Sequence, residues 1–158
     1  MILLNLAYFC SYINMETIQF SVLASWEKEL ITAAKQATQT SYAPYSQFNV
    51  GAAVLLSDGT ILTASNQENR AYSACVCAER VALLYATANY ANTPVTAIAV
   101  AASQHQQFTA QPVTPCGECR QVLVEMQERF NTPIQVLMYG EQSCYIARNA
   151  QELLPAAF

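Results

Sequence analysis

Residues 77–102 read CAERVALLYATANYANTPVTAIAVAA, and this stretch decides the fold class. Its first part, from Cys77 to Ala91, is rich in Ala and Leu and contains no Gly or Pro, which predicts a helix. After Pro94, the run from Val95 to Ala102 is almost wholly apolar, which is typical of a buried strand. A helix that leads into a buried strand indicates an α/β protein.

The sequence on either side continues the alternation of helices and strands. Apolar residues at helical spacing, with Ser25 as a candidate N-cap, predict a first helix from Trp26 to about Thr40. The same criteria predict strands at Phe48 to Leu56, from Ile61 onward and at Ile134 to Tyr139, and a helix at Gly117 to Arg129. We therefore predict a three-layer α/β/α sandwich with a mixed central sheet.

The charge balance argues against a polymeric nucleic-acid ligand. Seven Lys and Arg face eleven Asp and Glu, which gives a net charge of -4, and the basic residues form no cluster in the sequence. Affinity for DNA or RNA comes largely from clustered cations that neutralise phosphates. Charged residues make up only 11% of the chain, against roughly 25% in typical soluble domains. Uncharged surface on this scale favours an oligomer.

The N-terminal 24 residues are apolar but do not predict a membrane segment. No Lys or Arg precedes Lys28, and Asn5, Ser11, Asn14 and Glu16 interrupt the apolar run. The segment is too short and polar for a spanning helix and lacks the basic start of a secretory signal. We expect a cytoplasmic protein that does not bind membranes.

Two short motifs carry the chemistry: CAER at Cys77 to Arg80 and PCGECR at Pro115 to Arg120. They supply three cysteines, Cys77, Cys116 and Cys119, at the starts of two predicted helices, where the helix dipole favours thiolates. A structural zinc site uses four protein ligands, whereas a catalytic site uses three and leaves one position for water. The motifs therefore predict a catalytic Zn²⁺ site, with Glu79 as the unliganded carboxylate that moves protons.

The charge of such a site needs compensation. Zn²⁺ with three thiolates has a formal charge of -1, which disfavours ionisation of a bound water. Arg80 and Arg120 each neighbour a site residue, and we expect them to donate hydrogen bonds to the sulfurs.

The cysteines also allow interpretations other than a zinc site. A lone C-x-x-C beside an α/β pattern also fits a thioredoxin-like redox pair, and Cys75 is a weaker alternative to Cys77 as the first ligand. The Cys-Ala-Glu sequence at position 77 favours the zinc interpretation. Cys10, Cys144 and His105 have no motif around them, and no ligand role is expected for them.

The C-x-E and P-C-x-x-C motifs resemble those of the cytidine deaminases, in the three-cysteine, small-subunit form that assembles as a homotetramer. The resemblance extends over about Trp26 to Phe158. It includes four further segments: YAPYS at 42–46, FNVGAA at 48–53, NQEN at 66–69 and LLPAAF at 153–158. Together these motifs are highly specific.

The resemblance implies roles for further residues around a nucleoside. Asn66 and Glu68 would hold the ribose 3′-hydroxyl, although a solvated polar turn fits their spacing equally well. The other implied substrate contacts are Phe48 in the base pocket, Tyr72, the backbone of Ala78 and Thr114 at the pyrimidine edge, and Phe158. The implied reaction is hydrolysis at C4 of cytidine or deoxycytidine in pyrimidine salvage, with Glu79 serving N3 and the leaving ammonia.

The sequence also fits other functions and another role for its C-terminal residue. A blasticidin-type aminoglycosyl-nucleoside deaminase would share the zinc motifs, and a non-catalytic zinc-stabilised binding module would share the metal but has no use for Glu79. Low charge and the resemblance together predict a homotetramer in which Phe158 enters a neighbour's pocket. Alternatively, Phe158 caps the core of its own subunit.

Two features depart from the family pattern. Residues 1–24 have no counterpart in compact relatives, so we predict an N-terminal extension before a single domain at 25–158, with Met15 as an alternative start. Arg70 replaces a usually small residue at a position whose backbone approaches a neighbouring subunit's nucleoside. This replacement puts the shape of the 5′-side of the pocket in doubt.

Overall fold

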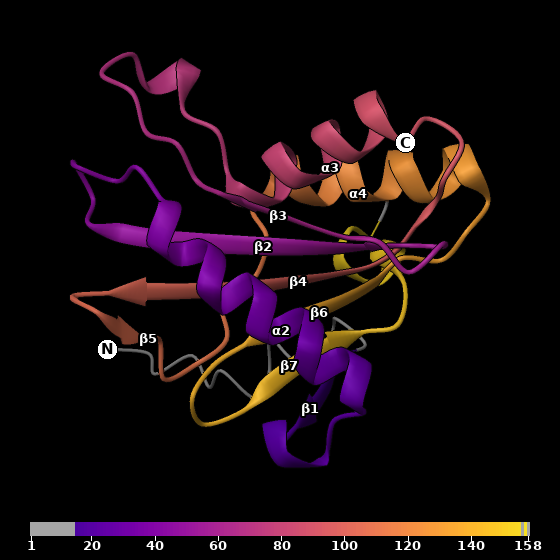
Figure 1. Cartoon of the computed structure of the whole chain (residues 1–158), viewed down its shortest axis with the longest axis horizontal. Helices are drawn as coiled ribbons and strands as arrows, with labels where there is room; N and C mark the ends of the chain where they lie inside the picture. The colour runs from indigo at the N-terminus through magenta and orange to yellow at the C-terminus, as the bar shows by residue number, and fades with distance from the viewer. Residues whose placement is uncertain (1–14, 156, 158) are drawn as a thin grey trace.

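A computed structural model of the chain describes residues 15–155 and 157, and within them seven strands form one sheet (Figure 1). The spatial order is β1-β7-β6-β4-β2-β3, and β5 pairs with β4. The β4–β6 pairing is parallel and the others are antiparallel, so the sheet is mixed as predicted. The strands are β1 (Glu16–Ile18), β2 (Phe48–Leu56), β3 (Ile61–Ser65), β4 (Val95–Gln104), β5 (Gln107–Phe108), β6 (Gln135–Tyr139) and β7 (Cys144–Ala147).

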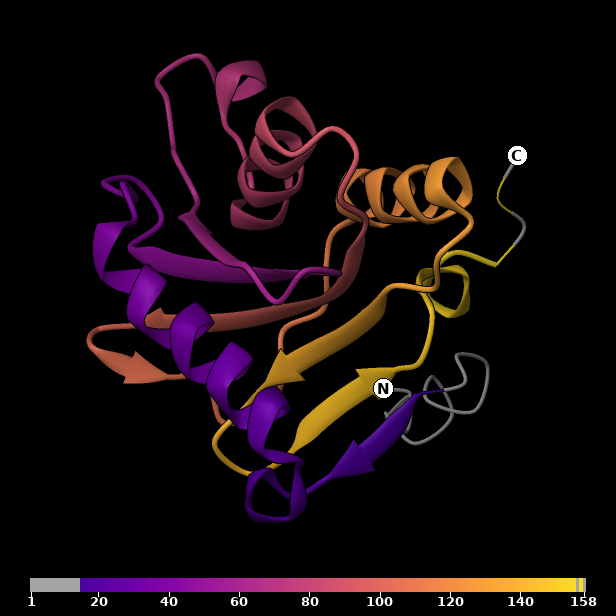
Figure 2. The same ribbon diagram turned by 45° about the vertical axis from the view of Figure 1, so that its right-hand side comes forward.

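The helices cover both faces of this sheet. Helix α2 (Ser25–Ala37) lies on one face, and α3 (Ala78–Asn89) and α4 (Gly117–Phe130) lie side by side on the other (Figures 1 and 2). Short 3₁₀ turns complete the described part: η1 (Phe20–Val22), η2 (Thr38–Thr40), η3 (Tyr72–Ala74) and η4 (Ala150–Leu153). The predicted three-layer α/β/α architecture is confirmed.

Strand β4 lies at the centre because its side chains are apolar on both faces. Ala97, Ala99 and Ala101 pack in the core beneath α2. Ile98 and Val100 pack in the second core, beneath α3 and α4. Successive side chains of a strand point to opposite faces, so an unbroken apolar run requires cover on both sides.

The structure corrects the predicted first helix at both ends. Helix α2 is capped by Ala24 rather than Ser25, because the Glu27 carboxylate reaches back and accepts a hydrogen bond of 2.9 Å from the Ala24 N–H. At the other end the α-helix stops at Ala37, and residues 38–40 form the 3₁₀ turn η2.

Three short strands were not predicted. Strands β1, β5 and β7 have three, two and four residues, too few for a periodic pattern to be recognised. Strand β1 lies within residues 1–24, the predicted extension, and pairs with β7; residues 1–14 lie outside the described part. None of the helices in residues 15–155 has the length and hydropathy that a membrane crossing demands.

Gly51 allows α2 to approach the sheet closely. A Cβ added at this position would meet the carbonyl oxygen of Ala34 and lie 2.7 Å from the backbone nitrogen of Thr38. Both contacts are backbone atoms, which cannot rotate away as the end of a side chain can. The glycine is therefore required by the distance between β2 and the end of α2.

We predict that Gly51→Ala lowers the free energy of unfolding by about 1–3 kcal/mol, because the added methyl group overpacks this contact. Urea denaturation followed by circular dichroism measures the change. Gly117→Ala is the matched control: a Cβ there has no neighbour within 4 Å, and stability should be unchanged to within about 0.5 kcal/mol. Equal stability of the two variants would contradict the close approach.

Candidate active site

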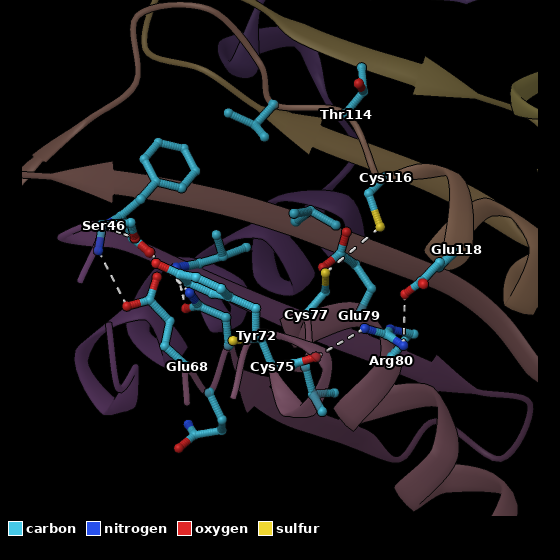
Figure 3. Close-up of a pocket in the computed structure, with 17 residues that line it drawn as sticks. Ser46, Glu68, Tyr72, Cys75, Cys77, Glu79, Arg80, Thr114, Cys116 and Glu118 are labelled. Carbon is cyan, nitrogen blue, oxygen red and sulfur yellow. Dashed lines mark hydrogen bonds and ion pairs between the residues drawn. The ribbon is translucent and has the colours of Figure 1, made fainter. Parts of the chain in front are cut away.

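The first turns of α3 and α4 bring three cysteines together. Cys77 is the N-cap of α3, Cys116 is the N-cap of α4, and Cys119 lies in the first turn of α4. The Sγ atoms of Cys77 and Cys116 are 3.7 Å apart (Figure 3), and those of Cys116 and Cys119 are 3.5 Å apart. All three sulfurs lie within 4.8 Å of one another, and they form the only such group of possible metal ligands among the described residues.

These distances fit zinc. A tetrahedral zinc ion with Zn–S bonds of about 2.3 Å holds its sulfurs about 3.8 Å apart. The pKa of Cys77 is lowered to about 5, chiefly by hydrogen bonds from Cys119 and then Cys116, which favours the thiolate form that binds metal. The pKa of Cys119 is raised, mainly because its thiol is the donor to Cys77. Cys77 therefore loses its proton easily, whereas Cys119 loses its proton only when a positive ion stabilises the adjacent thiolates.

Glu79 lies beside this cluster on the first turn of α3. Its side chain lines the same cavity as Cys77 and Cys116 and is only 4% exposed. Burial raises the pKa of this carboxyl, and the negative charge of Cys77 adds to the effect. A buried carboxyl with a raised pKa can both accept and return a proton, as general acid–base catalysis requires.

Arg80 lines the same cavity as Cys77 and Cys116. It forms an ion pair of 2.9 Å with Glu118 and donates a hydrogen bond of 3.3 Å to the carbonyl oxygen of Cys75. Its positive charge contributes to the lowered pKa of Cys77. Its Nε is buried and has no hydrogen-bond partner among the described residues. This uncommitted N–H is a donor that a thiolate can use.

Arg120 occupies a different position from the one expected. Its guanidinium donates hydrogen bonds to the carbonyl oxygens of Pro115 (2.8 Å) and Leu153 (3.3 Å) and to the Thr114 hydroxyl (3.3 Å). All three acceptors are oxygens, and none is a cysteine sulfur. Arg120 therefore ties the loop before α4 to the end of η4, and its effect on the cluster is to position Cys116.

A cavity of about 630 Å³ opens over the three-cysteine cluster. It brings together most of the predicted site residues: Phe48, Asn66, Glu68, Tyr72, Cys77, Glu79, Arg80, Thr114 and Cys116. Ala78 is fully buried, and its side chain does not line the cavity. Phe158 lies outside the described residues, and Arg70 is exposed in the loop before η3.

Asn66 and Glu68 reach the cavity from the loop after β3. The Asn66 Oδ1 accepts hydrogen bonds from the Ser41 hydroxyl (2.6 Å) and the Val50 N–H (2.8 Å), and its Nδ2 donates to the Phe48 carbonyl (3.0 Å). These bonds fix the amide and leave one N–H uncommitted.

Glu68 is held in a similar way. One carboxylate oxygen, Oε2, accepts from the N–H groups of Tyr45 (2.9 Å) and Ser46 (3.3 Å). Hydrogen bonds from Ser46 and Tyr45 lower its pKa, so it is an ionised acceptor at neutral pH. The other oxygen, Oε1, has no hydrogen-bond partner in the part of the chain that is described. A donor and an acceptor therefore face the cavity from neighbouring positions.

The sequence did not single out the apolar wall of the cavity. Val50, Val76, Val100 and Val113 line it between the polar ends. The alternation of Phe48 and Val50 along β2 was a usable signal, because residues two apart face the same side of a strand. Val113 precedes the PCGECR motif without any periodic pattern that would mark it.

The remaining cysteines and the histidine are placed apart from the cluster. Cys75 lines the cavity, but its sulfur is hydrogen-bonded to the backbone of Asn69 and is not part of the three-sulfur group. Cys144 is fully buried in β7, and His105 is exposed at the turn between β4 and β5. Cys10 lies outside the described residues.

We predict that the purified protein contains one zinc per chain and that Cys116→Ala loses it, because two thiolates cannot replace a three-sulfur site. Inductively coupled plasma mass spectrometry measures the metal content. Cys75→Ser is the control, since a hydroxyl can make the same bonds to Asn69 and the variant should keep its zinc. Normal zinc in the Cys116 variant would rule out this ligand set.

Comparison with known proteins agrees with the geometry. The family model of the cytidine and deoxycytidylate deaminase zinc-binding region matches residues 24–132. A cytidine deaminase from Halalkalibacterium halodurans is 41% identical over 129 residues, which cover 82% of this chain and 91% of that protein. A second, from Sporosarcina psychrophila, is 40% identical over 131 residues, 83% of this chain and 90% of that one.

Solved structures give the same result. The cytidine deaminase from Burkholderia pseudomallei superposes with a TM-score of 0.72 at 39% identity, covering 86% of this chain and all (100%) of that one. The enzyme from Mycobacterium tuberculosis superposes with a TM-score of 0.65 at 32% identity, covering 86% and 98%. With its three-cysteine zinc cluster at the starts of α3 and α4, the chain belongs to the zinc-dependent cytidine and deoxycytidylate deaminase family.

Proposed function

We propose that the protein hydrolyses cytidine and deoxycytidine to uridine and deoxyuridine with release of ammonia. The observation that carries the proposal is the position of Glu79, a buried carboxyl in the wall of a cavity that Cys77 and Cys116 of the three-cysteine cluster also line. A purely structural zinc site has no use for an unliganded carboxylate in that place. Release of ammonia from cytidine by the purified zinc protein tests the proposal directly.

Zinc, when bound by the three thiolates, supplies Lewis-acid activation of the attacking water. The protons of the reaction are moved by Glu79. Its carboxylate takes a proton from the water and delivers it to N3 of the ring, and it then takes the remaining proton of the added hydroxyl and gives it to the departing amine. One water is consumed, the C4–N bond breaks, and the products are a uracil nucleoside and ammonia.

The cavity also suits the rest of a nucleoside. Phe48 and Val100 offer apolar surface to the pyrimidine, and Thr114 lies near the zinc end of the cavity. At the other end, the uncommitted Asn66 N–H and Glu68 Oε1 match the acceptor and donor of one sugar hydroxyl. Among the residues that line the cavity, the only cation is Arg80, which is already paired with Glu118. This charge pattern favours an uncharged nucleoside over a phosphorylated one.

Glu79→Gln should lower kcat by about 10² to 10⁴, since the amide can neither accept nor return the proton. Zinc content and circular dichroism should match the parent protein. The same chemical change at Glu125, an exposed residue of α4 outside this cavity, serves as the control and should leave kcat unaltered. Turnover within tenfold of the parent would mean that another group moves the protons.

Glu68→Ala should raise KM for cytidine about tenfold or more, because a hydrogen bond between a hydroxyl and a charged acceptor is lost. Steady-state kinetics on cytidine and 3′-deoxycytidine separate this loss from any movement of the 45–46 loop. The substitution should raise KM strongly for cytidine but not for 3′-deoxycytidine. An equal effect on both substrates would show that Glu68 does not contact the 3′-hydroxyl.

The active unit is proposed to be a homotetramer. Leu84 and Tyr85 on α3 are more than half exposed (56% and 54%), and Tyr72 beside the cavity is 81% exposed, which leaves apolar surface for a partner subunit to cover. We expect Phe158 to enter a neighbour's pocket and pack against the nucleoside. A reducing compartment such as the cytoplasm suits the site, because its thiolates must stay unoxidised.

Sedimentation velocity and a truncation test this assembly. The parent protein should sediment as a tetramer, and removal of Phe158 should raise KM about tenfold while the tetramer persists, since aromatic stacking on a base contributes about 1–3 kcal/mol. A monomeric parent protein, or a truncated tetramer with an unchanged KM, would disprove the cross-subunit role.

A further inference from the structure

A second cavity, of about 420 Å³, lies on the opposite face of the sheet. Its wall comes from the end of α2, from η2 and from the ends of β2 and β4. Asn49 lines it, whereas Phe48 and Val50 on either side line the active-site cavity. Asn49 is paired across the sheet with Ser103, which also lines the second cavity. The two cavities are therefore back to back, as α2 and α3 are in Figure 2.

The second cavity carries one positive charge and no acidic side chain. Lys35 is its only charged lining residue. The ammonium donates a hydrogen bond of 3.1 Å to the Tyr139 hydroxyl and lies 4.2 Å from the centre of that ring and 4.6 Å from the Phe108 ring. Within the described residues it forms no ion pair. The ammonium is thus fixed in place and lacks an anion.

Uncharged polar side chains line the same cavity as Lys35. The Ser103 side chain is only 8% exposed, and neither its hydroxyl nor the Asn49 amide has a side-chain hydrogen bond to another described residue. At the end of α2, the carbonyl oxygens of Lys35 and Ala37 already accept from the hydroxyls of Thr38 and Thr40. The Ser103 hydroxyl and the Asn49 amide can each donate or accept, so the preference of the cavity for an anion with several acceptor oxygens comes from the Lys35 ammonium, which can only donate.

One hydrogen bond joins this cavity to the active site. Ser41 lines the second cavity, and its hydroxyl donates a bond of 2.6 Å to the Asn66 Oδ1. Asn66 lines the active-site cavity and is fixed by its bonds to β2. An anion in the second cavity would compete with Asn66 for the Ser41 proton, because a charged acceptor forms the stronger hydrogen bond.

We propose that this cavity binds a small molecule carrying an oxyanion, either a phosphate or a carboxylate group. Lys35, Ser103 and Asn49 hold the anion. Binding draws the Ser41 hydroxyl away from Asn66, which loosens the amide and weakens nucleoside binding. The site is a small-molecule inhibitory site, separate from the zinc cavity.

Equilibrium dialysis of the zinc-loaded full-length protein with radiolabelled inorganic phosphate, and separately with acetate, tests the binding and tells the two anions apart. At least one should bind saturably, and Lys35→Met should weaken that binding about tenfold or more. Lys28→Met is the matched control on the same helix, since the Lys28 ammonium bonds to the Ser21 carbonyl and is not in the cavity wall. Saturable binding of neither anion, or binding that survives Lys35→Met, overturns the proposal.

Kinetics test the coupling, which rests on the proposed function. A saturating amount of the bound anion should raise KM for cytidine about fivefold in the parent protein. In Ser41→Ala, compared with its own KM without anion, the increase should vanish. The coupling is rejected if the anion does not raise KM for cytidine in the parent protein, or if the anion still raises KM in Lys35→Met. Failure to deaminate cytidine would instead reject the proposed function, because the dialysis needs no turnover.

Discussion

The contact between the first turns of α3 and α4 is the constraint on which the site depends. Cys77 and Cys116 are both N-caps, and their sulfurs meet at 3.7 Å only because the two helices start side by side on the same face of the sheet. The sheet beneath fixes that arrangement through Val100, which lies in the core below both helices and also in the cavity wall. Helix placement, metal binding and the position of Glu79 therefore follow from one piece of packing.

The same sheet separates two environments that are one residue apart in sequence. Along β2, Phe48 and Val50 face the nucleoside cavity, whereas Asn49 and Gly51 face α2. Gly51 sets the close approach of α2, and the polar end of that helix leaves a cavity around Lys35. Strand alternation thus supplies a wall of the active-site cavity on one face of the sheet and a wall of the second cavity on the other.

Much of this organisation was predictable from the sequence, and the failures have physical causes. The starts of α3 and α4, the buried strand β4 and the three-cysteine cluster follow from local patterns and motif spacing. The hydrogen bonds of Arg120 could not be predicted in this way, because one acceptor, the Leu153 carbonyl oxygen, is distant in sequence and lies near Arg120 only in the folded chain. Strand β7 has only four residues, and its pairings with β1 and β6 are tertiary. The cavity at Lys35 is likewise assembled from segments that carry no shared motif.

Zinc K-edge X-ray absorption spectroscopy of the purified protein tests the central claim most directly, because it counts the atoms bound to the metal. Three cysteine ligands and an open position for water predict three sulfurs at about 2.3 Å and one oxygen at about 2.0 Å. Four sulfurs would indicate a closed structural site that includes a further cysteine. A histidine signature would equally contradict the three-cysteine centre from which the proposed chemistry is built.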